Sequence, residues 1–334
     1  MKKNWPINNL ESVRECPYCD SMSSNMVHSN VEDVSFRVAP GVWNFHQCAN
    51  CSSLYLNPRP TEDSIHNAYK DYYTHNKQSS LSTLSLLRFR IKNDWLSYHL
   101  NCEVAPRLNI PKRIIGFLSL VFNKPLPYWI KLLGKNDKIK GNFLDMGCGS
   151  GSSVRLAHQA GWNALGIDID SRAVQAANNE EIRVIQGDYK TLENYKEYFD
   201  YILCSHVLVH VHNPIEFLEK LSNSVASGGV IVLSLPNSTS MLRERFGNNW
   251  RGLEAPRHLT IPSQVQLINI MKSLKFDVQS FADSGRDTAI ESLRIERRSM
   301  KSNIFDILKA WLMNIRPNPD KNTNDFIKLV CTKL

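Results

Sequence analysis

The stretch GNFLDMGCGSGSSVRLAHQAGWNALGIDID, residues 141–170, decides the fold of this chain. It contains an apolar run over NFLDM, a glycine-rich loop, a segment with apolar residues at helical spacing, and a second apolar run over WNALGID. A strand, glycine loop, helix and strand in this order predict the nucleotide-binding half of a doubly wound sheet. Glycines at 147, 149 and 151 cost backbone entropy unless the loop needs their freedom, so we expect a ligand to approach that backbone closely.

The loop differs from the usual dinucleotide-binding signature. Its spacing is G-x-G-x-G instead of G-x-G-x-x-G, and Asp145 stands two residues before the first glycine. A carboxylate at that position disfavours a pyrophosphate and suits a ligand that carries an ammonium group. Asp168 follows at the end of the second strand, about 20 residues on, where an acid typically binds ribose hydroxyls.

The glycine loop, Asp145 and Asp168 together resemble the class I S-adenosylmethionine-dependent methyltransferases. The resemblance implies that the loop wraps the methionine part of S-adenosylmethionine and that Asp168 binds its ribose. Asp188, which ends a third strand in IRVIQGDYKTL, is then expected beside the adenine. The expected cofactor-binding residues are Asp145, Gly147, Cys148, Gly149, Gly151, Asp168, Ile169, Asp188, Tyr189 and Ser205.

Further strand and helix patterns follow in the family's order and extend the resemblance over roughly residues 125–334. We therefore expect an α/β fold: a doubly wound, seven-stranded, Rossmann-like methyltransferase sheet with a small N-terminal zinc ribbon and a helical connector. The predicted domains are a zinc-ribbon module at 1–60, a helical connector at 61–140 and the S-adenosylmethionine-binding domain at 141–334.

Four of the eight cysteines form two C-x-x-C knuckles, CPYC and CANC. Their residues are Cys16, Cys19, Cys48 and Cys51, and two such knuckles can direct four thiolates at one tetrahedral Zn²⁺. The intervening segment is long enough for a pair of β-strands. Four cysteines close the coordination sphere, so we expect a structural zinc; a thioredoxin-like redox pair is the alternative, but it leaves the second knuckle unexplained.

Positive charge is concentrated in the predicted connector. Residues 80–140 contain eleven Lys or Arg and three acids, which accounts for the net charge of +8 of the whole chain. This basic, partly apolar segment is either a solvated helical connector or a surface for an anionic partner, such as a membrane face, a lipid-pyrophosphate carrier or a nucleotide-sugar. No signature of an RNA-binding module occurs, so nucleic acid is not expected as a partner.

The segment FGNNWRGLEAPRHLTIPSQVQLINIMKSLKF resembles a subfamily that modifies sugars and surface polysaccharides. Sugar hydroxyls have a high pKa, so a general base is useful, and histidine is the natural choice near neutral pH. The candidate bases are His206 and His210 after the fourth strand, and His258 on the loop after the fifth. Candidate acceptor-binding residues are Tyr69, Tyr72, Tyr73, Trp250, Glu254 and Arg257, where the indole would stack on a sugar face and the guanidinium would bind phosphate.

The leading interpretation is an O-methyltransferase of a sugar hydroxyl in glycan or surface-polysaccharide biosynthesis, with a sugar, nucleotide-sugar or lipid-linked glycan as acceptor. Two alternatives within enzymes are a C-methyltransferase of a nucleotide-linked keto-deoxysugar and an RNA or protein methyltransferase. A fourth interpretation is a non-catalytic zinc-ribbon scaffold. No apolar signal-peptide core occurs in the first thirty residues and the longest clean apolar run in the middle of the chain has nine, which predicts a cytoplasmic or membrane-peripheral protein.

Overall fold

A computed structural model describes residues 5–69, 83–122, 128–134, 141–178, 182–282, 285–299, 301–313 and 321–334. The chain packs as two compact units. The first comprises Met1–Tyr73, Cys204–Asn223 and Val230–Leu334, and the second comprises Thr74–Leu203 and Ser224–Gly229. The predicted boundaries after residues 60 and 140 do not coincide with these units, because the N-terminal segment packs with the C-terminal part of the chain.

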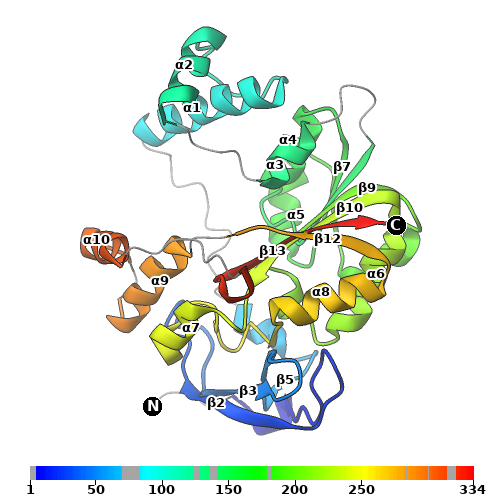
Figure 1. Ribbon diagram of the computed structural model, residues 1–334, viewed down its shortest axis with the longest axis vertical. Coiled ribbons are helices and arrows are strands. Elements are labelled where there is room, and N and C mark those ends of the chain that lie inside the picture. Colours follow the sequence, from blue (N-terminus) through cyan, green and yellow to red (C-terminus); the bar gives the residue numbers. More distant parts are fainter. Residues whose placement is uncertain are drawn as a thin grey trace. The chain divides into compact units, whose positions relative to one another are not determined.

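The predicted seven-stranded sheet is confirmed, with the order β12-β13-β10-β9-β6-β7-β8 (Figure 1). Strands β6, β7 and β8 pair in parallel, whereas β13 runs antiparallel to both β10 and β12. The bounds are β6 Asn142–Met146, β7 Asn163–Asp168, β8 Val184–Gln186, β9 Phe199–Ser205, β10 Val225–Pro236, β12 Phe276–Ser280 and β13 Phe326–Lys333. The carboxyl ends of β6 and β7 therefore carry the glycine loop and Asp168, as the sequence pattern predicts.

Helices α4 (Ser152–Gln159) and α5 (Ser171–Asn178) pack on the parallel strands of the second unit. The basic segment contains the helices α1 (Thr83–Leu100), α2 (Lys112–Phe122) and α3 (Tyr128–Leu133), and the described residues 101–111 between α1 and α2 are not helical. Two hydrogen bonds attach α3: the indole N–H of Trp162 donates to Leu133 O over 3.1 Å, and the Tyr201 hydroxyl donates to Trp129 O over 3.1 Å. The rings of Trp162 and Tyr201 also pack together, with centroids 5.8 Å apart.

The segment between the two cysteine knuckles forms the expected strands, β2 (Ser24–Val31) and β3 (Trp43–Cys48). They belong to a four-stranded sheet of order β11-β4-β3-β2, in which β4 spans Leu54–Leu56 and β11 spans Thr260–Ile261. Thr260 pairs with Tyr55 and Ile261 with Leu54. The N-terminal sheet is thus completed by a strand about 200 residues later in the chain, and it is not a separate module.

In the described part of the first unit the α-helices are α6 (Pro214–Ser224), α7 (Met241–Phe246), α8 (Gln264–Ser273), α9 (Arg286–Glu296) and α10 (Ile304–Leu312). Helix α8 packs on β12, and α9 and α10 lie side by side (Figure 1). Short β1 (Leu10–Glu11) and β5 (Arg59–Pro60) form a two-stranded sheet near the N-terminus. None of the described helices combines the length and apolar character needed to cross a bilayer.

Candidate active site

The glycine loop after β6 adopts a backbone that only glycine takes readily. Gly149 has φ +51° and Gly151 has φ +71°, both in the left-handed region. A Cβ built on Gly149 meets no atom within 4 Å, so this point of the loop faces open space where a ligand can approach. A Cβ on Gly151 would lie 2.4 Å from Ile182 Cδ1, which shows that close packing also requires glycine there.

The two acids of the motif lie on either side of this loop. The Gly149 N–H donates to Asp168 Oδ2 over 2.7 Å, and the Asp170 N–H donates to Asp168 Oδ1 over 2.9 Å, which fixes the carboxylate. The pKa of Asp145 is raised to about 7, mainly by burial. A hydrogen bond with Ser153 opposes this shift, and the charge of Asp168 adds to it. A ligand ammonium would favour the ionised form of Asp145, so this carboxyl fits the amino end of S-adenosylmethionine.

The other expected cofactor residues surround the same motif in the second unit, apart from Ser205. Ile169 is 65% exposed beside Asp168 and presents an apolar surface suited to a flat ring. Asp188 is exposed and accepts the Lys190 N–H over 2.9 Å, and Tyr189 begins the short helix that follows. Cys148 is buried, and Ser205 is the last residue of β9. This donor set fits S-adenosylmethionine: a buried acid for its ammonium, an open glycine and a fixed carboxylate for its ribose.

The first unit contains a pocket of about 400 Å³. Its walls come from His206 after β9, the loop that carries Arg251 and His258, the start of α9, and the beginning of β13. Most of the described lining residues carry polar or charged side chains, with Pro236 and Phe326 as apolar members. The pocket therefore suits a ligand rich in hydrogen-bonding groups.

The structure brings two of the three candidate histidines to this pocket, His206 and His258. His206 has φ +59°, and its ring packs against Phe326 with centroids 5.2 Å apart. Protein atoms around the ring reduce its hydration and lower the pKa of His206 to about 4, and the nearby His210 lowers it as well. The imidazole is therefore neutral at physiological pH and is able to accept a proton.

His258 and His210 are held more tightly. His258 is buried, its Nδ1–H donates to Gly252 O over 2.7 Å, and burial lowers its pKa to about 3. His210 Nδ1–H donates to Arg257 O over 2.9 Å, and the Tyr69 hydroxyl lies 3.1 Å from the same nitrogen. Its ring centroid is 4.8 Å from that of His258, behind the pocket wall.

A family model described as a methyltransferase domain matches residues 121–280, which include the glycine loop, Asp168 and Asp188. The chain contains a class I S-adenosylmethionine-dependent methyltransferase domain. An uncharacterized protein of Methanocaldococcus jannaschii is 29% identical over 159 residues, which cover 41% of each chain. A protein of Rickettsia typhi named ubiquinone biosynthesis O-methyltransferase is 32% identical over 110 residues, 31% of this chain and 44% of that protein.

The matched part spans less than half the length of these curated relatives. Among solved structures, an S-adenosylmethionine-dependent methyltransferase from Archaeoglobus fulgidus is 18% identical, with a TM-score of 0.43. That comparison covers 66% of this chain and 94% of the other.

Three acceptor-binding expectations outside the methyltransferase motifs need correction. Trp250 is 1% exposed and its indole N–H donates to Asp325 Oδ1 over 2.9 Å, so its ring has no open face for a sugar. Arg257 is fully buried between Asp33 and Glu254 and does not reach a phosphate. Glu254 lines the pocket, but its carboxylate is paired with Arg251 and Arg257.

Of the expected tyrosines, Tyr69 lies against His210, whereas Tyr72 and Tyr73 fall outside the described residues. Arg251, which flanks His258 in the sequence and was expected near a phosphate, does line the pocket. The structure also places there several residues that the sequence did not indicate: Arg286, Asp287, Glu291, Asp325, Phe326 and Lys328. They come from α9, β13 and the preceding loop, so no local motif joins them. Apart from the charge of five of these six residues, the sequence contains no signal for them.

The four cysteines of the two knuckles converge as expected. All four Sγ atoms lie within 4.8 Å of one another, with Cys16 and Cys51 Sγ 3.5 Å apart and Cys19 and Cys48 Sγ 3.6 Å apart. Zn–S bonds of about 2.3 Å in a tetrahedron place the sulfurs about 3.8 Å apart, so the spacing fits a four-thiolate metal site. The Asn50 amide also donates to Cys19 Sγ over 3.5 Å.

Proposed function

We propose that this chain is an S-adenosylmethionine-dependent methyltransferase that O-methylates a sugar hydroxyl. The carrying observation is the pocket beside His206, which combines a neutral imidazole with a mostly polar lining. S-adenosylmethionine supplies an already activated methyl group. The residues of the chain then have to hold the acceptor, align its oxygen and take up the proton it loses.

His206 is the proposed general base. Its side chain is accessible at the pocket wall, and its position there is the argument for this role. The pKa lowered to about 4 keeps the imidazole unprotonated at neutral pH and also makes it a weaker base than free histidine. His258 is buried, with Nε2 3.7 Å from Glu254 Oε2, and we assign it to shaping the wall. His210, bonded to Arg257 O, supports that wall from behind.

The charges of the pocket support a sugar that carries phosphate, as in a nucleotide-linked or lipid-linked acceptor. Arg286 is exposed at the start of α9 and Lys328 lies on β13, so both can attract an anion. Asp287 offers carboxylate oxygens to sugar hydroxyls, whereas both oxygens of Glu291 already accept hydrogen bonds, from Arg294 and Ser302. An O-methylated phenol is the second candidate, because relatives are named ubiquinone biosynthesis O-methyltransferases.

We further propose that Cys16, Cys19, Cys48 and Cys51 bind one structural Zn²⁺. Four thiolates would complete a tetrahedral coordination sphere and leave no position open for a substrate. The site lies next to β11, since the Ser263 hydroxyl donates to Cys51 O over 2.7 Å and the Tyr18 hydroxyl lies 3.0 Å from Thr260 Oγ1. Metal binding would thus stabilise the loop that carries His258.

The test is methyl transfer from S-adenosylmethionine labelled in its methyl group. Purified protein is incubated with a panel of nucleotide-sugars, lipid-linked sugars and catechol-type phenols, and the products are analysed by mass spectrometry and NMR. An O-methylated sugar supports the proposal, and a methyl group on carbon identifies the C-methyltransferase alternative. Methylation of phenols with no reaction on any sugar would overturn the acceptor class.

A further inference from the structure

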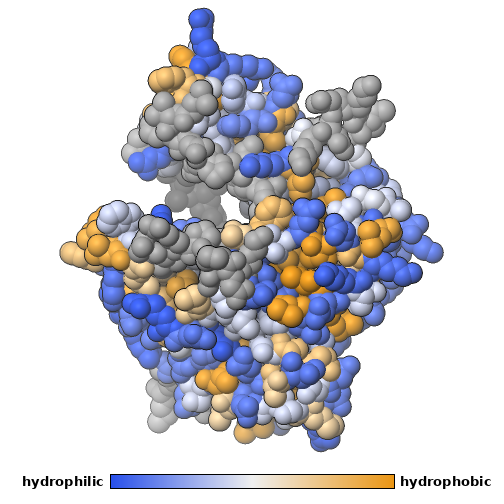
Figure 2. All heavy atoms as spheres, in the orientation of Figure 1, coloured by the Kyte–Doolittle hydropathy of each residue, from blue (hydrophilic) through white to orange (hydrophobic). Residues whose placement is uncertain are grey.

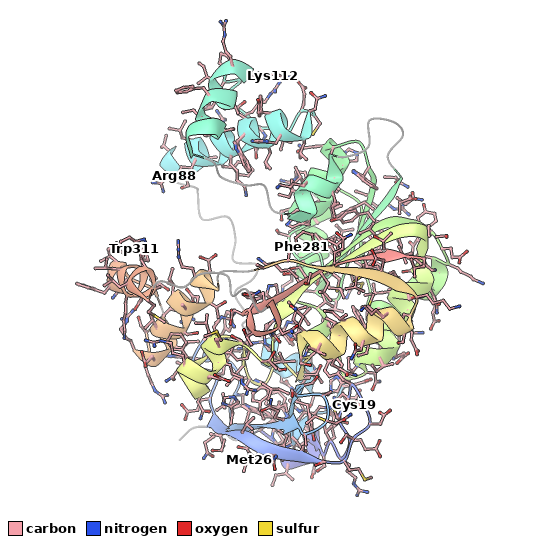
Figure 3. The ribbon with its side chains drawn as sticks, in the orientation of Figure 1. Cys19, Met26, Arg88, Lys112, Phe281 and Trp311 are labelled. Atoms are coloured by element: carbon pink, nitrogen blue, oxygen red, sulfur yellow. The ribbon has the colours of Figure 1, made fainter. Side chains whose placement is uncertain are left out.

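Helix α10 presents a broad apolar face to solvent. Six large apolar side chains on it are between 49% and 73% exposed: Ile304, Phe305, Ile307, Leu308, Trp311 and Leu312. At 100° per residue they occupy one continuous side of the helix. Figure 2 shows hydrophobic surface at the left edge of the view, where Figure 1 places α10 and Figure 3 labels Trp311.

The opposite side of α10, with short or polar residues, packs on the protein. Ala310 and Asp306 are buried. Arg297 Nε donates to Asp306 Oδ1 over 2.8 Å, which connects α10 to the end of α9. An Asn303–Asp306 capping box fixes the first turn. A helix that stabilises a soluble core buries its apolar side, and α10 does the reverse.

The surroundings of this face are basic. Residues 294–313 contain five Arg or Lys and two acids. Lys309 borders the apolar side with a side chain that is 60% exposed and lies 3.8 Å from Glu296 Oε2, and Lys301 is exposed just before the helix. An apolar stripe with Trp, Phe and Leu beside Lys and Arg is the pattern of helices that lie in the interface of an anionic bilayer.

We propose that α10 is a monotopic membrane-docking helix that inserts its apolar face at the boundary between headgroups and acyl chains of an anionic bilayer. The aromatic rings of Phe305 and Trp311 would lie at headgroup level, and Lys301 and Lys309 would contact anionic headgroups. A second copy of the chain is a poorer occupant, because joining two such faces would bring two basic rims together. The proposal does not depend on the identity of the acceptor.

The sequence analysis places a possible membrane surface in residues 80–140, and helix α2 of that segment exposes an apolar face of its own. Helix α2 exposes Ile114, Phe117 and Leu118 beside Lys112 and Arg113. This face has three apolar residues and no Trp, against six with Trp on α10. Helix α2 therefore serves as the matched control for the test.

The experiment is flotation of the full chain with vesicles of phosphatidylcholine, with and without phosphatidylglycerol. We expect binding to the anionic vesicles that weakens as salt screens the basic rim. The triple variant Phe305→Gln, Leu308→Gln and Trp311→Gln should reduce the partition coefficient by about tenfold or more, because it removes apolar surface and keeps a good helix former. The matched variant Ile114→Gln, Phe117→Gln and Leu118→Gln should change it by less than about twofold.

Two readouts separate docking from misfolding. Both triple variants should keep the circular dichroism spectrum and the S-adenosylmethionine affinity of the parent chain. Brominated acyl chains should quench the fluorescence of Trp311 in the parent, and the variant Trp311→Phe should still bind vesicles but lose that quenching.

Three results would overturn the proposal: no binding of the parent chain to anionic vesicles at low salt, loss of binding in the α2 variant alone, or a dimer in solution that dissociates in the α10 variant while vesicle binding is absent. The last result would assign the face to a second copy. The absence of methyl transfer to any sugar would not bear on the membrane-docking proposal.

Discussion

Arg257 and Asp33 stand 224 residues apart in the chain and form a buried, two-pronged ion pair. Arg257 Nη2 donates to Asp33 Oδ1 over 2.6 Å, and Nη1 donates to Oδ2 over 3.1 Å. The same carboxylate accepts backbone N–H groups of Val38 and Ala39 over 3.0 Å each. Asp33, in the N-terminal sheet region, thus holds the loop that carries His258. The N-terminal region and this loop therefore have to fold together.

Replacing Asp33 with Ala should lower the free energy of unfolding by about 3–5 kcal/mol, because it leaves the buried guanidinium of Arg257 with less compensation. Urea unfolding monitored by circular dichroism measures the change. The exposed acid Glu62 provides the control, and Glu62→Ala should stay within about 0.5 kcal/mol of the parent. Equal stability of the two variants would contradict the structural role of this ion pair.

The contribution of this ion pair should depend on pH. Burial raises the pKa of Asp33, but the hydrogen bond and charge of Arg257 and the backbone donors lower it by more, so the net shift is downward. A carboxyl with a lowered folded-state pKa stabilises the fold above its unfolded value of about 3.9 and loses that contribution as pH falls. The difference in unfolding free energy between the parent and Asp33→Asn should be constant near neutral pH and shrink below about pH 4. A difference that grew in acid would refute this assignment.

Asp168→Ala should weaken S-adenosylmethionine binding by about 100-fold, since hydrogen bonds to a charged group contribute about 1.5–3 kcal/mol each. It also removes the acceptor of the Gly149 N–H and so loosens the loop. Isothermal calorimetry with S-adenosylmethionine and its demethylated product is the measurement. Asp170→Ala is the matched control, because Asp170 bonds outward to Arg172, and it should bind nearly as tightly as the parent.

Cys48→Ser should abolish zinc binding, whereas Cys102→Ser, outside the cluster, should leave one zinc per chain. Because metal binding and local folding are coupled in such sites, the Cys48 variant should also lose thermal stability. Elemental analysis and a melting curve recorded together test both points. Full zinc content in the Cys48 variant would exclude the four-cysteine site.

His206→Ala should reduce turnover by about 10²–10⁴-fold and leave S-adenosylmethionine affinity nearly unchanged, as expected for loss of a general base. Since a base must be unprotonated and the pKa of His206 is lowered to about 4, the parent should lose activity only as pH falls toward 4. Turnover is measured across pH and S-adenosylmethionine affinity by calorimetry, for the parent, His206→Ala and, for comparison, His210→Ala. Normal turnover in His206→Ala would mean that transfer relies on alignment alone.

Much of the cofactor motif and the cysteine cluster was predictable from the sequence. The motif residues Gly147, Gly149 and Asp168 lie within one contiguous unit of strand, loop, helix and strand. Their relative positions therefore follow from their spacing in the sequence. Two C-x-x-C knuckles likewise predict a shared metal site for Cys16, Cys19, Cys48 and Cys51. In these places the residue type and the local spacing determine the chemistry.

The pocket beside His206 is decided by tertiary structure. In the sequence, the loop before β11 looks open, because it contains polar and aromatic residues such as Trp250, Glu254 and Arg257. In the structure, β11 pairs with the N-terminal sheet, and these three side chains are buried. Burial and ion pairing with remote residues such as Asp33 then decide which side chains face a ligand. Among the histidines, only packing separates the accessible His206 from the buried His258, because distant strands of the sheet set each environment. The sequence by itself predicts the cofactor motif, because that motif is local, whereas the packing of segments more than 200 residues apart decides which side chains the pocket beside His206 presents.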